Sequence, residues 1–444
     1  MSANRRIFYA LSWVTTAGVA VKLVATGKEL VIADIFGRGN VIDAFVMAFL
    51  IPGLLVNLFA ESINQALIPT LVRVREEEGQ QSAQELLSSA MTWSTGLLVC
   101  GAVGMGLAAR VVFPLALRFP PDKLALTEHL FYGLLPVVLL AGLASNCTAV
   151  LNTQERFALP ALLPMVTPLS IIAAAWALSG RLGIWSLVVG NVAGALMHAL
   201  AVGALMQRHG YWFSLRLSGL RLGARTVALS QVSAQYGPIL LSGLLASGGL
   251  LVDQGMAATL RAGSVAALAY ASRFTGVAMM LLGGALATAI TPYFARMVAV
   301  QDWKGCRHTL NTYARLSALV ATPLAVGMIF GSHWIIHLAF QHGAFHAEDT
   351  AAVAPVQAMY AIQLPFFVVS RVYYRYLLAI RRSGLILACG GLNLVLDVVL
   401  NIVLMRWMGV AGIALATSLW AVSTLVFLAY WSYKLLPKVN GIEV

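Results

Sequence analysis

The chain has 444 residues, of which 60% are hydrophobic and only 10% are charged, and its formal net charge is +12. Soluble domains carry about 25% charged residues, so this composition excludes a soluble globular protein and predicts an all-α polytopic membrane protein. The basic residues are spread over short connections and are not gathered in a stripe, which argues against a nucleic-acid partner.

Apolar stretches long enough to cross a bilayer as helices, at roughly 20 residues each, occur about twelve times. The first stretch lacks a small-residue cleavage site and is expected to stay in the membrane. No large extramembrane domain fits between the stretches. In chain order they lie near residues 7–35, 41–70, 86–114, 130–151, 160–179, 183–206, 227–255, 263–294, 309–331, 350–376, 384–405 and 409–435.

Lys and Arg are distributed unevenly between alternate connections. One set holds the basic residues of both termini together with pairs such as Arg73 and Arg75, or Arg381 and Arg382, whereas the other set holds few. Because cytoplasmic connections collect Lys and Arg, both termini are expected in the cytoplasm.

Two lysines, Lys22 and Lys28, lie inside the first apolar stretch. A charge near the bilayer midplane costs several kcal/mol, so such residues usually face a wet cavity or a partner. The alternative is that their side chains extend to the interface. However, the two lysines lie roughly 9 Å apart along a helix, so both cannot easily reach the same interface. The pattern favours a transporter that binds an anionic substrate.

An internal duplication predicts the architecture. Residues 66–73 and 289–296 share Ala, Pro and Arg at the same positions. We therefore expect two six-helix lobes of the same orientation, 1–206 and 226–444, around a central cavity, joined by a basic cytoplasmic linker, 207–225. A chance match between apolar helices is the alternative.

A polar face in the second half predicts an ion site. Asn393, Asp397 and Asn401 are spaced i, i+4 and i+8 within an apolar helix, and Asp253 supplies a second carboxylate. Carboxylate and amide oxygens suit a hard cation, and a lone Asp in the membrane would otherwise be protonated. A sodium site is favoured over two alternatives, a proton relay and structural hydrogen bonding between helices.

Motifs for catalysis are largely absent. Gly27-Lys28 lacks the remainder of a phosphate-binding loop, and Gly343 interrupts the histidines of the connection 333–349 that could otherwise ligate zinc. The protein is therefore not expected to be an enzyme. A membrane-embedded glycan ligase using a base in that connection remains an alternative.

Several short motifs resemble the MurJ (MviN) family of lipid II flippases, and they cover nearly the whole chain in the family's order. The wider superfamily also contains polysaccharide-repeat exporters and multidrug and toxin extruders. The motifs are Gly37–Phe45 with Ile51-Pro52, Leu58–Glu61, Leu151–Thr153 with Arg156-Phe157, Gly263–Val265 with Tyr270–Arg273, and Phe340–Phe345.

The resemblance implies a set of functional residues. Essential arginines of the family correspond to Lys22, Lys28 and Arg273, which keep the charge but lose the bidentate geometry at two of three positions. Asp43 matches an acidic residue thought to pair with cavity cations during transport. The remaining implied positions are Asn57 and Glu61 for the substrate, and Asp253, Asn393, Asp397 and, more loosely, Thr417 for sodium.

Two departures limit what the resemblance implies. Asn57 stands where lipid II flippases usually carry a further arginine, and about twelve helices are expected here, whereas characterised members add two more. The expected function is flipping of a polyprenyl-diphosphate-linked saccharide, lipid II or similar, across the bacterial cytoplasmic membrane by alternating access. The alternatives are an exopolysaccharide or O-antigen repeat-unit flippase and a multidrug antiporter. No cofactor is expected beyond a coupling sodium ion, and the expected partners are membrane lipids and cell-wall or polysaccharide synthesis proteins.

Overall fold

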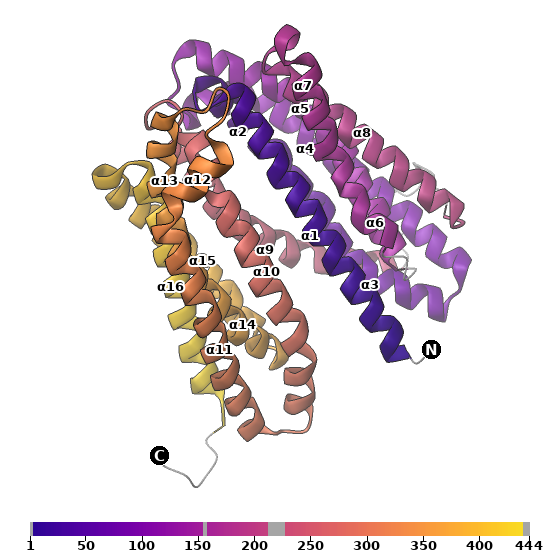
Figure 1. The fold of residues 1–444 in the computed structure, drawn as a ribbon. Coiled ribbons are helices and arrows are strands. Elements are labelled where there is room, and N and C mark those ends of the chain that lie inside the picture. The colour runs from indigo at the N-terminus through magenta and orange to yellow at the C-terminus, as the bar shows by residue number, and fades with distance from the viewer. Residues whose placement is uncertain (1–2, 154–157, 212–226, 438–444) are drawn as a thin grey trace. The chain divides into compact units, whose positions relative to one another are not determined.

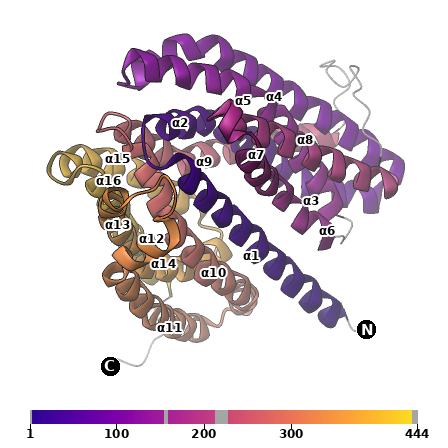
Figure 2. The ribbon, with the colours of Figure 1, turned by 45° about the horizontal axis from the view of Figure 1, so that its top comes forward.

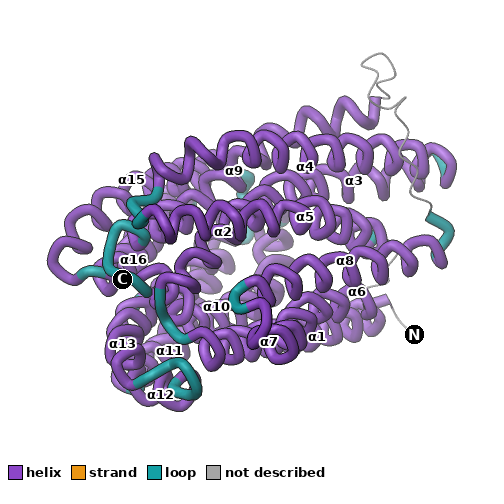
Figure 3. The backbone as a smooth tube through the Cα atoms, turned by 90° about the horizontal axis from the view of Figure 1, so that it is seen from above, coloured by secondary structure: helices purple, strands orange, loops and turns teal. Residues whose placement is uncertain are grey.

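The computed structural model describes residues 3–153, 158–211 and 227–437, and within these ranges its regular elements are helices joined by short turns (Figures 1 and 3). The chain divides into two compact units, Met1–Ser247 and Gly248–Val444. The boundary falls within a helix, α9, and the predicted linker 207–225 lies mostly outside the described residues. The predicted lobe boundaries therefore stay a prediction.

Unit 1 is organised around one central helix, α5. This helix packs against α2, α4 and α8, while α7 packs on α8 and α1 packs on α6 and α7. Figure 2 shows α4 and α5 side by side along much of their length. The helices of unit 1 are α1 (Ala3–Phe36), α2 (Asn40–Leu55), the π-helical turn η1 (Val56–Glu61), α3 (Ser62–Glu77), α4 (Gln80–Ala116), α5 (Pro121–Asn152), α6 (Ala158–Leu162), the 3-10 turn η2 (Leu163–Met165), α7 (Val166–Leu182), α8 (Trp185–Arg208) and the first part of α9 (Val227–Ala257).

Unit 2 has α14 at its centre. This helix packs against α10, α11 and α16, and Phe294, Leu310 and Tyr376 are fully buried in the core that these helices share. The helices of unit 2 after α9 are α10 (Ser264–Ala299), α11 (Trp303–Phe330), α12 (Ser332–Phe340), α13 (Ala347–Ala361), α14 (Gln363–Ala379), α15 (Ser383–Met408) and α16 (Val410–Leu435).

The prediction of an all-α polytopic membrane protein is confirmed. Eleven helical segments in the described part of the chain have the length and hydropathy needed to cross a bilayer. Some combine two elements, such as Asn40–Glu77, in which α2, η1 and α3 run on without a break. The predicted stretch 7–35 lies within one helix, α1, which is not among the eleven. The count of about twelve spans and the two-lobe layout stay predictions.

A close contact between α7 and α8 depends on two glycines. Gly190 and Gly194 are four residues apart on α8, the small-xxx-small spacing that lets membrane helices approach closely. A Cβ atom at Gly190 would lie 2.7 Å from the Cα of Ile171, and one at Gly194 would lie 2.8 Å from the Cα of Thr167. The obstacle is backbone in both cases, so α7 would have to move.

We expect Gly194→Ala to lower the stability of unit 1 by about 1–3 kcal/mol, the usual cost of overpacking. The matched control is Gly203→Ala on the same helix, where a Cβ would meet no atom within 4 Å. Thermal unfolding of the purified variants in detergent gives the comparison. Equal melting temperatures for the two variants would contradict the close packing of α7 on α8.

Candidate functional site

The two lysines of α1 differ in their surroundings. Lys22 is exposed, whereas Lys28 is half-buried and its Nζ lies 2.8 Å from Oε1 of Glu29. The Glu29 side chain is only 8% exposed. The sequence analysis did not consider Glu29, which partly neutralises Lys28 and fixes the position of its ammonium group.

Asp43 has a buried partner within unit 1. It lies in the first turn of α2 with 1% of its surface exposed, and its Oδ2 is 2.7 Å from Nζ of Lys123 near the start of α5. The ammonium of Lys123 also lies 3.9 Å from the centre of the Phe119 ring, which adds a cation–π contact. The sequence analysis did not single out Lys123, so its role as the partner of Asp43 was missed.

Asn57 and Glu61 lie on the π-helical turn η1, and both are exposed. Ser145 Oγ on α5 donates a hydrogen bond of 2.6 Å to Glu61 Oε1. Asn64 Nδ2 in turn donates to Ser145 Oγ over 2.8 Å. Single π-helical turns are frequent at functional sites, and here the turn determines where these two polar side chains point.

Unit 2 brings together polar residues from three helices. Asp253 on α9 accepts a hydrogen bond from Asn401 Nδ2 of α15 at its Oδ1 (2.8 Å) and from Thr417 Oγ1 of α16 at its Oδ2 (3.1 Å). All three residues are buried. The sequence analysis expected Asp253 and Thr417 at one site, and the structure places them in direct contact.

Asp397 on α15 is 1% exposed, and neither of its carboxylate oxygens has a hydrogen-bond partner in the described part of the chain. It faces α9, because a Cβ atom at Gly249, one turn before Asp253, would lie 3.4 Å from Asp397 Oδ2. The Oδ1 atom of Asn401 is also buried without a partner. Buried acceptor oxygens without donors are costly unless a proton or a cation satisfies them.

Asn393 has no hydrogen bond to Asp253, Asn401 or Thr417 in the described part of the chain and instead contacts Thr424. Its Nδ2 donates to Thr424 Oγ1 of α16 over 2.8 Å, and its Oδ1 is buried without a partner. The structure thus joins Asp253, Asn401 and Thr417 directly, places Asp397 against the same helix as Asp253, and gives Asn393 a separate contact with α16. Carboxylate, amide and hydroxyl oxygens in such a cluster fit a hard cation.

Arg273 lies in the first third of α10, on unit 2, and is exposed. It shares no compact unit with Lys22 and Lys28, which belong to unit 1. The predicted cavity formed by these three cations therefore stays a prediction.

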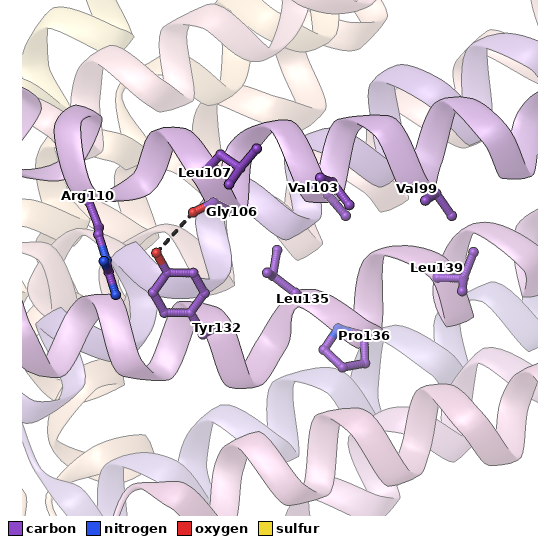
Figure 4. Close-up of a pocket in the computed structure, with 10 residues that line it drawn as sticks. Val99, Val103, Gly106, Leu107, Arg110, Tyr132, Leu135, Pro136 and Leu139 are labelled. Carbon is purple, nitrogen blue, oxygen red and sulfur yellow. Dashed lines mark hydrogen bonds between the residues drawn. The ribbon is translucent and has the colours of Figure 1, made fainter.

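An apolar groove of about 770 Å³ runs between α4 and α5 of unit 1 (Figure 4). Arg110 lies at one end of it, and the hydroxyl of Tyr132 donates to the carbonyl oxygen of Gly106 over 3.0 Å. Arg110 is the one basic side chain among the described residues that line the groove. The groove therefore differs from the cationic cavity predicted around Lys22, Lys28 and Arg273. The other lining residues are apolar: Val99, Ala102, Val103, Leu107, Leu135, Pro136 and Leu139.

An all-helical membrane fold with charged residues held inside apolar helices is typical of polytopic transporters. The comparisons specify the family. The family model "Lipid II flippase MurJ" matches residues 32–443, and the chain therefore belongs to the MurJ family.

Individual relatives agree with this assignment. A probable lipid II flippase MurJ of Buchnera aphidicola is 25% identical over 406 residues, which cover 88% of this chain and 77% of the relative. The lipid II flippase MurJ of Burkholderia cenocepacia is 28% identical over 370 residues, which cover 81% of this chain and 70% of the relative.

Solved structures show the same fold. A lipid II flippase MurJ in an inward closed conformation matches with a TM-score of 0.80 and 21% identity, covering 96% of this chain and 88% of its own. A multidrug resistance MATE family transporter of the MOP superfamily, in an inward-facing conformation, matches with a TM-score of 0.81 and 12% identity, covering 94% of each chain.

Proposed function

We propose that this protein is a flippase that moves a polyprenyl-diphosphate-linked saccharide, lipid II or a close analogue, from the inner to the outer leaflet of the bacterial cytoplasmic membrane. The observation that carries this proposal is the family match over residues 32–443. The protein makes and breaks no covalent bond, and both termini lie in the cytoplasm. Cell-wall or polysaccharide synthesis proteins are the expected partners.

The headgroup is held by cations. Lys28, half-buried beside Glu29, and Lys22 on the same helix present positive charge inside an apolar segment, and Arg273 supplies a third cation from α10. A diphosphate gains more from such cations in a low-dielectric site than it would in water. The transporter then alternates between inward-open and outward-open states. Differential binding of substrate, an ion or the membrane potential must bias that equilibrium.

Sodium is the proposed coupling ion. Asp253, Asp397, Asn401 and Thr417 would hold it, because the buried oxygens of Asp397 and the Oδ1 of Asn401 lack hydrogen-bond donors. A bound cation supplies the positive charge that two neighbouring buried carboxylates require. Asn393 Oδ1 is a further buried acceptor on α15. Binding of the ion would tie α9, α15 and α16 together and so favour one arrangement of these helices.

Asp397→Asn is expected to abolish stabilisation by sodium. A ligand at 100 times its Kd stabilises the native state by about 2.7 kcal/mol, so the melting temperature of the wild-type protein should rise when sodium replaces potassium at constant ionic strength. The matched control is Asp302→Asn at the start of α11, where asparagine can still cap the helix. The control should keep the full sodium response.

Two other results would revise the ion assignment. If the melting temperature of the wild-type protein is independent of sodium but depends on pH, the cluster is a proton relay between Asp253 and Asp397 and not a sodium site. If the melting temperature depends on neither sodium nor pH, the role of this cluster is hydrogen bonding between helices.

Substrate class is tested by native mass spectrometry of the purified protein with lipid II, an undecaprenyl-diphosphate oligosaccharide and undecaprenyl monophosphate. Charge-assisted hydrogen bonds are roughly twice as strong as neutral ones, so binding should follow the diphosphate more than the sugar. Asn57, in place of a further arginine, is the residue that favours a saccharide other than that of lipid II. Equal retention of the monophosphate, or preference for a cationic drug, would contradict the proposed substrate class.

A further inference from the structure

Two arginines on α14 have no role in the site described above. Arg371 and Arg375 are four residues apart, so they lie on one face of the helix, roughly 6 Å from each other. Both are half-buried within the apolar membrane segment Ala347–Ala379. Charged residues inside a membrane segment are costly and usually mark a ligand or ion pathway.

Among the residues that the structure describes, neither arginine has an acidic partner. No ion pair within the described part of the chain involves Arg371 or Arg375, and the buried Nε of Arg375 has no hydrogen-bond partner there. The contacts that hold the two side chains are aromatic. The Cζ atom of Arg371 lies 4.3 Å from the centre of the Phe367 ring, and that of Arg375 lies 5.8 Å from the centre of the Tyr374 ring. Stacking of this kind leaves the N–H groups at the guanidinium edges available to a ligand.

The Cζ atom of Arg371 lies 4.3 Å from the centre of the Phe367 ring and 5.7 Å from that of the Tyr374 ring, so its closer aromatic contact is the one farther from the C-terminal end of α14. The helix ends at Ala379, just before the basic turn of Arg381 and Arg382 that the charge distribution assigns to the cytoplasm. Phe367 lies one turn farther from that end than Arg371. A guanidinium stacked on Phe367 is therefore directed away from the C-terminal end of α14, whereas a side chain that extends to the cytoplasmic interface would be directed toward that end.

A neighbouring helix places these arginines relative to Arg273. A Cβ atom at Gly283 of α10 would lie 3.8 Å from Cγ of Arg371, so the arginine side chain lies against α10 at this glycine. Arg273 precedes Gly283 by ten residues, or roughly 15 Å along the helix. Arg375 and Arg371 lie roughly 6 and 12 Å before the cytoplasmic end of α14. The three arginines thus follow one another from the cytoplasmic end of unit 2 toward its other end.

We infer that Arg371 and Arg375 form a second anion site, which binds the diphosphate of a polyprenyl-linked lipid in the inner leaflet before it reaches Arg273. Two guanidinium groups one helical turn apart carry the charge needed to neutralise a diphosphate, and each can make a bidentate contact with phosphate oxygens. The depth of the pair suits a phosphate that enters from the inner leaflet. The identity of the lipid rests on the proposed function, whereas the anion site rests on the geometry of α14.

Binding of undecaprenyl diphosphate, undecaprenyl monophosphate and inorganic diphosphate to the purified full-length protein tests this inference. We expect the double variant Arg371→Gln/Arg375→Gln to weaken binding of undecaprenyl diphosphate by about tenfold or more, because it removes charge-assisted contacts. The matched control is Arg381→Gln/Arg382→Gln, which removes the same charge from the exposed turn and should bind as the wild type does. Both pairs should also be made in a Lys28→Ala background, so that binding at α1 cannot mask the loss.

Conservative variants separate ligand binding from packing. Arg371→Lys/Arg375→Lys keeps the charge and should recover part of the affinity, whereas Phe367→Leu removes the stacked ring and keeps both guanidinium groups. If Phe367→Leu and the double Gln variant lower both the binding and the melting temperature to the same extent, the arginines act as packing groups and the site is excluded. The Lys variant also keeps the test informative if the Gln variant does not fold.

Two outcomes would overturn the inference or part of it, and a third would exclude only the proposed function. Unchanged binding by the double Gln variant, in both backgrounds, would exclude the site. Inorganic diphosphate that binds as tightly as the lipid, with the same loss in the variant, would assign the arginines to a soluble anion. A wild-type protein that binds the lipid through these arginines but does not move it across a membrane would instead exclude the proposed function and leave the anion site intact.

Discussion

Lys28→Ala is expected to abolish lipid transport while the protein still inserts in the membrane. The substitution removes a cation from an apolar helix and leaves Glu29, whose side chain is 8% exposed, without the ammonium group 2.8 Å away. A substrate diphosphate would then meet the Glu29 carboxylate where the wild-type protein presents the ammonium group of Lys28. Complementation of a flippase-deficient strain, with membrane levels checked by immunoblot, measures the effect.

Two further variants separate the roles of Lys28. Lys28→Arg keeps the charge and should retain transport, at least in part. Lys28→Ala/Glu29→Gln removes both members of the ion pair, so it should remain inactive if Lys28 contacts the substrate. Recovered transport in this double variant would mean that Lys28 serves only to neutralise Glu29. Full activity of both Lys22→Ala and Lys28→Ala would remove these lysines from the substrate site.

Lys123→Met is expected to destabilise unit 1, by up to about 3–5 kcal/mol, because it removes the cationic member of a buried ion pair. The carboxylate concerned is that of Asp43, which is 1% exposed and 2.7 Å from the lost ammonium. The double variant Asp43→Leu/Lys123→Met replaces the whole pair with apolar groups, and it should recover most of that loss. Thermal unfolding in detergent at pH 7 compares the three proteins.

The same double variant tests the functional role of Asp43. A protein that is stable but does not transport lipid would support the role implied by the family resemblance, in which Asp43 exchanges partners during transport. A stable and active double variant would show that the Asp43–Lys123 pair is structural. A Lys123→Met variant with the same melting temperature as the wild-type protein would contradict the buried ion pair itself.

The membrane class could be predicted from sequence because apolar length and low charge leave few alternatives for a chain of this composition. Other features depend on contacts between distant residues. Lys123 lies 80 positions from Asp43, and no local pattern joins them. The sequence around Val56–Glu61 predicts an uninterrupted apolar helix, but the structure has a π-helical turn there. Because a π-helical turn changes the helical periodicity, the exposure of Asn57 and Glu61 could not be derived from the sequence pattern.

Helical spacing predicted the polar residues of the ion site on α15 but not the partner of each one. Asn393 and Asn401 were predicted on one face of α15, but eight residues turn a helix by roughly 80° beyond two full turns. The two amides consequently meet different partners, Thr424 for Asn393 and Asp253 for Asn401. Knowing which neighbour each side of a helix faces requires the packing of α9, α15 and α16.

The arginine pair of α14 was missed although the sequence contained its signal. Arg371 and Arg375 lie inside the predicted apolar stretch 350–376, where the argument applied to Lys22 and Lys28 holds equally. What sequence could not show is the absence of a carboxylate partner in the described part of the chain and the stacking of Arg371 on Phe367.

The central claim is tested most directly by reconstituting the purified protein in liposomes that contain lipid II and an undecaprenyl-diphosphate oligosaccharide. The measurement is the rate at which each headgroup becomes accessible to a membrane-impermeant reagent. We predict that the wild-type protein exposes at least one polyprenyl-diphosphate-linked saccharide, that Lys28→Ala does not, and that an anionic phospholipid in the same liposomes is not moved. Equal rates for wild type and Lys28→Ala, or no transfer of either saccharide lipid by the wild-type protein, would contradict the account.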